Sequence, residues 1–221
     1  MTNARNAGRM VGALMIAQGI GSYVTNFALL RPVLAPPGSL VNAAPHALEV
    51  GLSAVLGILT GAIVLAIAIT VLPVLRQFSE RMALSFVAMG AVALSLAAVE
   101  NGTLMSLLSL SKAYAASGAA DPAAFEGLRG VVAASRNWAH FTHITIGGAT
   151  LLIFYVALYR FALVPRALAA IGLIAVALQL TTVTRPFFGG EVTFFLLAPL
   201  GLANLAVALW LLIKGLADKP A

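Results

Sequence analysis

The side chains best suited to chemistry lie where a polar segment passes into a long apolar run. Arg136, His140 and His143 follow one another at helical spacing, so a guanidinium and two imidazoles share one stripe of the helix. Imidazoles exchange protons near neutral pH, bind metal ions and hydrogen-bond to ligands. This stripe is the strongest indication of a functional site in the chain.

Two carboxylates are candidates to act with these imidazoles. His46 and Glu49 lie three residues apart near one face of a second helix, and Glu100 is followed by Asn101 in a third. A charged side chain within lipid costs several kcal/mol unless it is paired or hydrated, so both carboxylates should face other helices. Glu100 then has two open interpretations: a structural one, pairing with Arg136 or binding a helix end, and a functional one in ligand binding or proton chemistry.

The metal interpretation has weaker support. Three His and two Glu could supply a zinc or iron site without cysteine, of which the chain has none. No His-Glu-x-x-His or repeated Glu-x-x-His pattern is present, however. We therefore predict no metal site, and the sequence identifies no cofactor. Hydrogen bonding to a neighbouring helix and contact with a ligand remain the main alternatives for the imidazoles.

The amino-acid composition indicates that transmembrane helices position these residues. Hydrophobic residues make up 61% of the chain and charged residues 9%, with a mean hydropathy of +1.01. These values are typical of a bundle of transmembrane helices. The net charge of +6 does not indicate nucleic-acid binding, because the Lys and Arg residues lie singly at the ends of apolar runs, where they act as membrane anchors. We expect an all-α polytopic membrane protein.

The apolar runs predict six helices in a single domain that covers residues 1–221. The link at 76–81 is so short that the second and third helices must be antiparallel neighbours. The longest link, 111–135, is expected to form an outer loop. The expected helices cover residues 10–30, 45–75, 82–110, 137–161, 166–184 and 191–213.

The distribution of Lys and Arg predicts the orientation. Eight of them lie at the helix ends on the side of the termini, against five on the other side. Because cytoplasmic loops carry the excess of basic residues, we expect both termini in the cytoplasm and residues 111–135 outside. In a bacterium this places the chain in the inner membrane.

Depth along the helices predicts where the polar residues gather. At ~1.5 Å per residue, Glu100 lies about 28 Å from Arg81 and Asn26 about 25 Å from Arg9. Arg185, at the outer end of the fifth run, could balance Glu100, bind an anionic head group or extend to the interface. We expect a polar pocket in the outer leaflet. Its candidate residues are Asn26, His46, Glu49, Glu100, Asn101, Arg136, His140, His143 and Arg185.

Short motifs resemble a known family. They lie at residues 4–8, 139–140, 155–160, 163–166 and 209–215. In this order they are similar to the bacterial integral-membrane family catalogued as domain of unknown function 4386, over nearly the whole chain. The resemblance implies a compact six-helix inner-membrane protein without an established activity. It marks His140 as a family feature, and it implies an acidic residue near Asn204 that this chain lacks.

Three functions stay open from the sequence. The first is a binding or accessory protein that holds a lipid-like small molecule, a partner membrane protein or a second copy of itself at the outer-leaflet pocket. The second is a membrane enzyme that uses Glu100 or Glu49 with His140 for acid-base isomerisation or cyclisation of an apolar substrate. The third is a small proton-coupled transporter. Against it, the polar residues gather at one depth, and no comparable series of polar residues continues through the cytoplasmic half of the helix bundle.

Overall fold

The computed structural model describes residues 4–217, and every regular element in that range is a helix. Six helical segments are long and apolar enough to cross a membrane. Both findings confirm the predicted all-α membrane class and the six spans. They follow from the long apolar runs, because a chain in lipid must satisfy its backbone hydrogen bonds within each segment.

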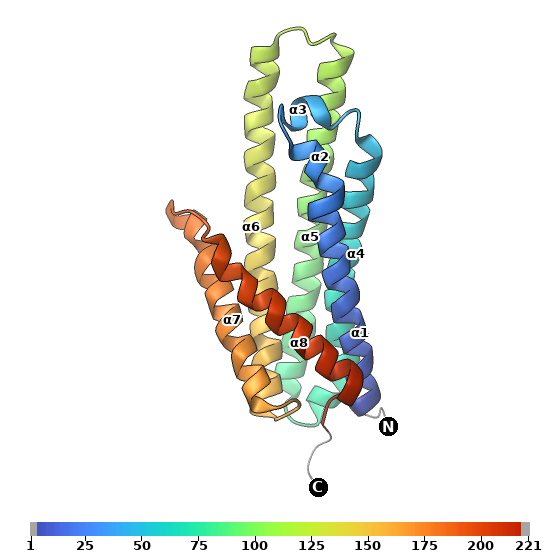
Figure 1. The fold of residues 1–221 in the computed structure, drawn as a ribbon, viewed down its shortest axis with the longest axis vertical. Helices are drawn as coiled ribbons and strands as arrows, with labels where there is room; N and C mark the ends of the chain where they lie inside the picture. The colour runs from blue at the N-terminus through green and yellow to red at the C-terminus, as the bar shows by residue number, and fades with distance from the viewer. Residues whose placement is uncertain (1–3, 218–221) are drawn as a thin grey trace. The chain divides into compact units, whose positions relative to one another are not determined.

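The chain up to Arg76 forms two of the long segments (Figure 1). A π-helix, Val24–Leu29, interrupts the first of these segments. The helices are α1 (Ala4–Tyr23), α2 (Leu30–Leu34), α3 (Ser39–Asn42) and α4 (Ala47–Arg76).

The chain from Glu80 onward forms four long segments, and two of them far exceed the length that a bilayer requires. The ~30 Å hydrocarbon core needs about 20 residues of helix. The helices are α5 (Glu80–Ala116, 37 residues), α6 (Pro122–Arg160, 39 residues), α7 (Arg166–Thr184) and α8 (Ala198–Lys214). Short 3-10 helices, Arg185–Phe188 and Phe194–Leu197, lie between α7 and α8.

The structure corrects the predicted outer loop at 111–135. Helix α5 continues to Ala116 and α6 already begins at Pro122, which leaves only residues 117–121 as a turn. Alanine favours helix, and proline fits the first helical position because its missing amide hydrogen has no partner there. The Asp121 carboxylate also accepts a hydrogen bond from the amide of Ala124 at 3.2 Å, which caps the start of α6.

Contacts group the chain into two compact units. Unit 1 comprises Met1–Gln18, Ala62–Leu94 and Ile144–Ala221, and unit 2 comprises Gly19–Gly61 and Ser95–His143. Four helices, α1, α4, α5 and α6, therefore contribute a segment to each unit.

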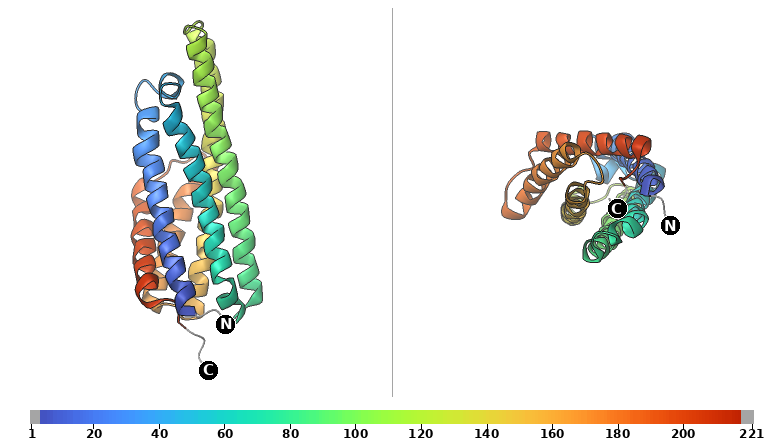
Figure 2. Two further views of the ribbon diagram at one scale, coloured as in Figure 1. Left: turned by 90° about the vertical axis from the view of Figure 1, so that its right-hand side faces the viewer. Right: turned by 90° about the horizontal axis from the view of Figure 1, so that it is seen from below.

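Unit 1 has a tightly packed apolar core. Its largest fully buried side chains include Tyr155, Phe154 and Leu75, and the rings of Phe86 and Phe154 stack with their centroids 5.5 Å apart. Helices α7 and α8 lie side by side and run in opposite directions (Figures 1 and 2). The core contacts hold segments of six helices together, namely α1, α4, α5, α6, α7 and α8.

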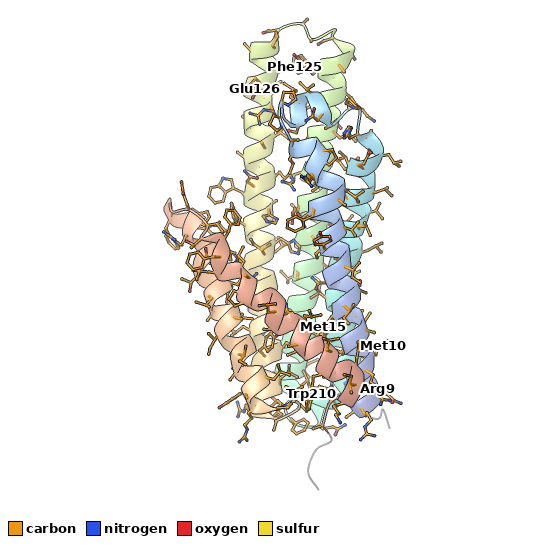
Figure 3. All side chains as sticks on the ribbon, viewed as in Figure 1. Arg9, Met10, Met15, Phe125, Glu126 and Trp210 are labelled. Atoms are coloured by element: carbon orange, nitrogen blue, oxygen red, sulfur yellow. The ribbon has the colours of Figure 1, made fainter. Side chains whose placement is uncertain are left out.

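Unit 2 contains a smaller core and a helical hairpin. The core joins α2, α4 and α5 through buried aliphatic residues such as Leu30, Val50 and Leu104, together with Ala43 directly after α3. The hairpin of α5 and α6 continues past α3, as Figure 2 shows. At its tip, near the labelled Phe125 and Glu126 in Figure 3, the ring of Phe125 contacts Tyr114 at 5.3 Å between centroids.

Candidate functional site

The central feature of the candidate site is one carboxylate that contacts two imidazoles. Glu100 comes from α5, and His140 and His143 come from one face of α6 in the same unit. Oε1 of Glu100 lies 2.8 Å from Nδ1 of His140, and Oε2 lies 2.7 Å from Nδ1 of His143. Helical spacing of three residues stacks the two imidazoles on one side of α6, where one carboxylate can reach both.

These contacts determine which ring nitrogens remain available. An ionised carboxylate only accepts hydrogen bonds, so both Nδ1 atoms donate to Glu100, and in the neutral form of each imidazole Nε2 keeps a lone pair. The Glu100 side chain is 14% exposed, whereas those of His143 and His140 are 24% and 41% exposed. The carboxylate is thus the most buried group of the cluster, and the imidazoles are the groups that a ligand can reach.

Arg136 lies one helical turn before His140 on α6 and has an unsatisfied buried donor. Its Nε atom is buried and has no hydrogen-bond partner among the residues that the structure describes. A buried donor without a partner costs roughly 1–3 kcal/mol, more for a charged group. An arginine in this position is suited to bind an oxyanion.

Asn101 is near Glu100 in sequence but has a packing role. It is buried, and its amide donates to the carbonyl oxygen of Ala97 at 2.7 Å. Its side chain lies against Gly57 of α4, where an added Cβ would overlap the amide group. Gly57 therefore allows α4 and α5 to approach each other around this amide.

Three further candidates in unit 2 make no hydrogen bond or ion pair with Glu100. Asn26, in the π-helix, donates to the carbonyl oxygen of Ser22 at 2.9 Å and so bonds within its own helical segment. His46 and Glu49 are half-buried at the start of α4. Among the described residues, neither side chain makes a hydrogen bond or ion pair with the cluster.

Arg185 belongs to unit 1, in the turn between α7 and α8. Its Nη1 donates to Oγ1 of Thr193 at 2.6 Å. The amide of Thr193 in turn donates to Oγ1 of Thr182 at 2.6 Å. These bonds give Arg185 a local role in holding the turn against the end of α7.

One buried polar contact in unit 1 was not among the candidate residues. The hydroxyl of Tyr155 on α6 donates to Oδ1 of Asn204 on α8 at 2.7 Å, and Tyr155 is fully buried. The sequence contained a signal for it, because Asn204 is the single amide in the apolar run of α8. A buried asparagine in such a run needs a partner on a neighbouring helix.

Within the described part of the chain, no group of three His, Asp or Glu side chains is placed to hold a metal ion. Both oxygens of Glu100 already contact imidazoles. What the cluster offers a ligand is two imidazole acceptors with the guanidinium of Arg136 nearby.

Comparison with known families identifies the family of the chain. Residues 10–215 match the model of a family described only as a domain of unknown function, number 4386. No curated protein and no solved structure matches the chain.

Proposed function

The chain belongs to the family of domain of unknown function 4386, and we propose that it binds a lipid-like molecule with an acidic head group at the Glu100 cluster. The observation that carries this proposal is the contact of one carboxylate with two imidazoles, at 2.8 and 2.7 Å, on membrane-spanning helices. Ionisable groups at such positions are costly and are usually retained for function. We also propose the inner membrane of a bacterium as the location.

Unused bonding capacity supports an acidic head group. The buried Nε of Arg136 has no hydrogen-bond partner within the described residues, and a guanidinium binds carboxylates and phosphates strongly. The Nε2 atoms of His140 and His143 are acceptors for a hydroxyl group. A ligand with an oxyanion beside a hydroxyl would satisfy all of these groups.

The surroundings of the cluster support an apolar tail. Trp138, which is 48% exposed, and Phe141 lie on the same helix, with ring centroids 6.2 Å apart. Along α5, Glu100 lies about 30 Å from Glu80, near one boundary of a hydrocarbon core of that thickness. A molecule that places its head group at the cluster would have its tail in the bilayer.

An acid-base enzyme is the second candidate, and the same contacts favour it. A carboxylate that fixes the tautomer and orientation of an imidazole is the arrangement that prepares a general base. One accessible Nε2 would remove a proton from a bound substrate, and the resulting imidazolium would return the same proton from Nε2 at a second position of the substrate. Such a proton shuttle would suit isomerisation or cyclisation of the same lipid-like class.

Native mass spectrometry of the detergent-purified protein tests the binding proposal. We expect the wild type to carry one defined acidic lipid-like molecule. Arg136→Gln should lower its occupancy by about tenfold, the effect of one lost charged interaction with the head group. Glu100→Gln should also lower the occupancy, because the carboxylate that orients both imidazoles is lost. Arg129→Gln is the matched control, since Arg129 lies on the same helix but forms an exposed pair with Glu126. A wild type without a bound molecule, or equal loss in Arg129→Gln and Arg136→Gln, contradicts the proposal.

Incubation with the identified molecule separates the two candidates. A molecule that is recovered with its structure unchanged supports binding alone. A rearranged product that forms with the wild type but not with Glu100→Gln supports the enzyme. A co-purifying membrane protein in place of a small molecule would instead identify a partner helix as the occupant, contrary to our proposal.

A further inference from the structure

A second candidate binding site lies in unit 1, away from the residues discussed so far. It is a pocket of about 630 Å³ at the end of the unit where α8 ends and α7 begins. Trp210 and Arg9, both labelled in Figure 3, mark this end of the unit. The pocket is lined by residues 162–166, residues 214–217, Arg5 and Trp210.

The lining carries charge of only one sign. Arg5, Arg166 and Lys214 are basic, and none of the described lining residues is acidic. The side chains of Arg166 and Lys214 are exposed, and neither makes an ion pair with a described residue. Two cations that share a cavity without an anion repel each other, and a bound anion removes this repulsion.

Close backbone contacts hold the pocket in shape. The amide of Ala217 donates to the carbonyl oxygen of Leu163 at 2.9 Å, which ties the segment after α8 to the turn between α6 and α7. Gly215 has a φ of +76°, and a Cβ at this position would overlap the backbone of Arg5. A Cβ on Gly8 would likewise overlap the backbone of Leu216. The walls are therefore positioned by the fold before any ligand binds.

We propose that this basic pocket binds a phosphate group, as the head group of an anionic phospholipid presents it. Arg166 supplies a planar fork of donors that matches phosphate oxygens, and Lys214 adds a second positive charge. Trp210 is half-buried at the helix end, where an indole occupies the membrane interface. The excess of basic residues predicts that this end faces the cytoplasm, whose leaflet carries anionic lipids.

General anchoring by basic residues is the competing explanation, and it makes a different prediction. An anchoring arginine extends to the interface wherever it stands at a helix end. Arg76 is such a residue, exposed at the end of α4 in the same unit but outside the pocket lining. Anchoring predicts similar effects of removing Arg76 or Arg166, whereas a phosphate site predicts an effect of Arg166 alone.

The test measures lipid binding to the full-length protein in detergent by native mass spectrometry. Phosphatidylglycerol is titrated against phosphatidylcholine, with wild type, Arg166→Gln/Lys214→Gln and Arg76→Gln. We expect the wild type to prefer phosphatidylglycerol, the double variant to bind it about tenfold more weakly, and Arg76→Gln to stay within about twofold of wild type. Equal binding by the double variant and the wild type overturns the proposal, as does an equal loss in Arg76→Gln.

Two further arms complete the test. If inorganic phosphate at millimolar concentration displaces phosphatidylglycerol, the ligand is a soluble phosphate compound. If it does not, the ligand is the lipid head group. Both results support the phosphate site. If the double variant does not fold, the two single variants replace it. Wild-type affinity in both single variants would overturn the proposal.

Discussion

Two buried polar contacts in this protein have similar distances and different consequences. In unit 1, Tyr155 donates to Asn204 at 2.7 Å inside a packed apolar core. In unit 2, Glu100 receives hydrogen bonds from His140 and His143 at 2.8 and 2.7 Å, and both imidazoles remain partly exposed. Distance alone does not separate a structural contact from a candidate site.

The difference lies in what each contact leaves available. The Tyr155 hydroxyl gives its single hydrogen to Asn204 and is shielded from any ligand, since Tyr155 is fully buried. The Glu100 cluster leaves two accessible imidazole nitrogens and the Nε of Arg136, which has no hydrogen-bond partner among the described residues. A polar group in a membrane-spanning helix indicates function when it is both reachable and incompletely bonded. Removing the Glu100 contact should therefore lower both the stability and the ligand occupancy, whereas removing the Tyr155 contact should lower the stability alone.

Removing the Glu100 carboxylate should give the largest effect. Glu100→Ala leaves two imidazole donors without their acceptor, at roughly 1–3 kcal/mol for each buried donor. Because both imidazoles are partly exposed, we expect a total loss of about 2–4 kcal/mol in the free energy of unfolding, together with loss of the bound molecule. Denaturation in mixed micelles measures the first quantity, and native mass spectrometry measures the second.

The control for this prediction is Glu49→Ala. Glu49 is half-buried in the same unit and makes no ion pair with a described residue. Its removal should change the unfolding free energy by no more than about 0.5 kcal/mol, as for a surface substitution. Equal losses of unfolding free energy in Glu100→Ala and Glu49→Ala would mean that the imidazole contacts of Glu100 do not stabilise unit 2.

Crowding Tyr155 should give the second largest loss of stability. This change tests the buried contact in the core of unit 1. A methyl group at Gly172 would overlap the ring of Tyr155, which has no room to move within the core. Overpacking of this kind costs about 1–3 kcal/mol. We expect Gly172→Ala to lower the midpoint of thermal unfolding without changing the bound molecule. Gly201→Ala, with no atom within 4 Å of the added Cβ, should be neutral or slightly stabilising.

The number of membrane-spanning helices could be predicted from the sequence because lipid imposes it. A chain can cross the hydrocarbon core only as an apolar helix of sufficient length, and hydropathy detects that directly. The ends of the helices do not follow the same rule. Residues 111–116 and 122–135 are too polar for lipid but still helical, since helix formation outside the membrane depends on propensity and capping. Hydropathy therefore located the spans and missed the long hairpin.

The candidate site could be predicted only in part, for a related reason. Counting residues along each helix estimates depth, and it placed Glu100, His140 and His143 at one level. It does not give the rotation of a helix about its own axis. His46 and Glu49 were expected in the same pocket, but neither contacts Glu100 in the structure. The pairing of Tyr155 with Asn204 also depends on which helices are neighbours, and an isolated sequence pattern does not contain that information.

The smallest expected effect is that of Tyr155→Phe, and it tests the comparison most directly. Interhelical hydrogen bonds in membrane proteins contribute about 0.6 kcal/mol on average and at most about 1.7 kcal/mol, because the unfolded chain in a membrane also finds partners. We expect a loss in this range, and a double-mutant cycle with Asn204→Leu should assign most of it to the pair. The occupancy of the bound molecule should not change. If Tyr155→Phe instead lowers that occupancy as much as Glu100→Gln does, the Tyr155 contact is part of ligand binding. In that case, burial and complete hydrogen bonding do not distinguish a structural contact from a binding site in this protein.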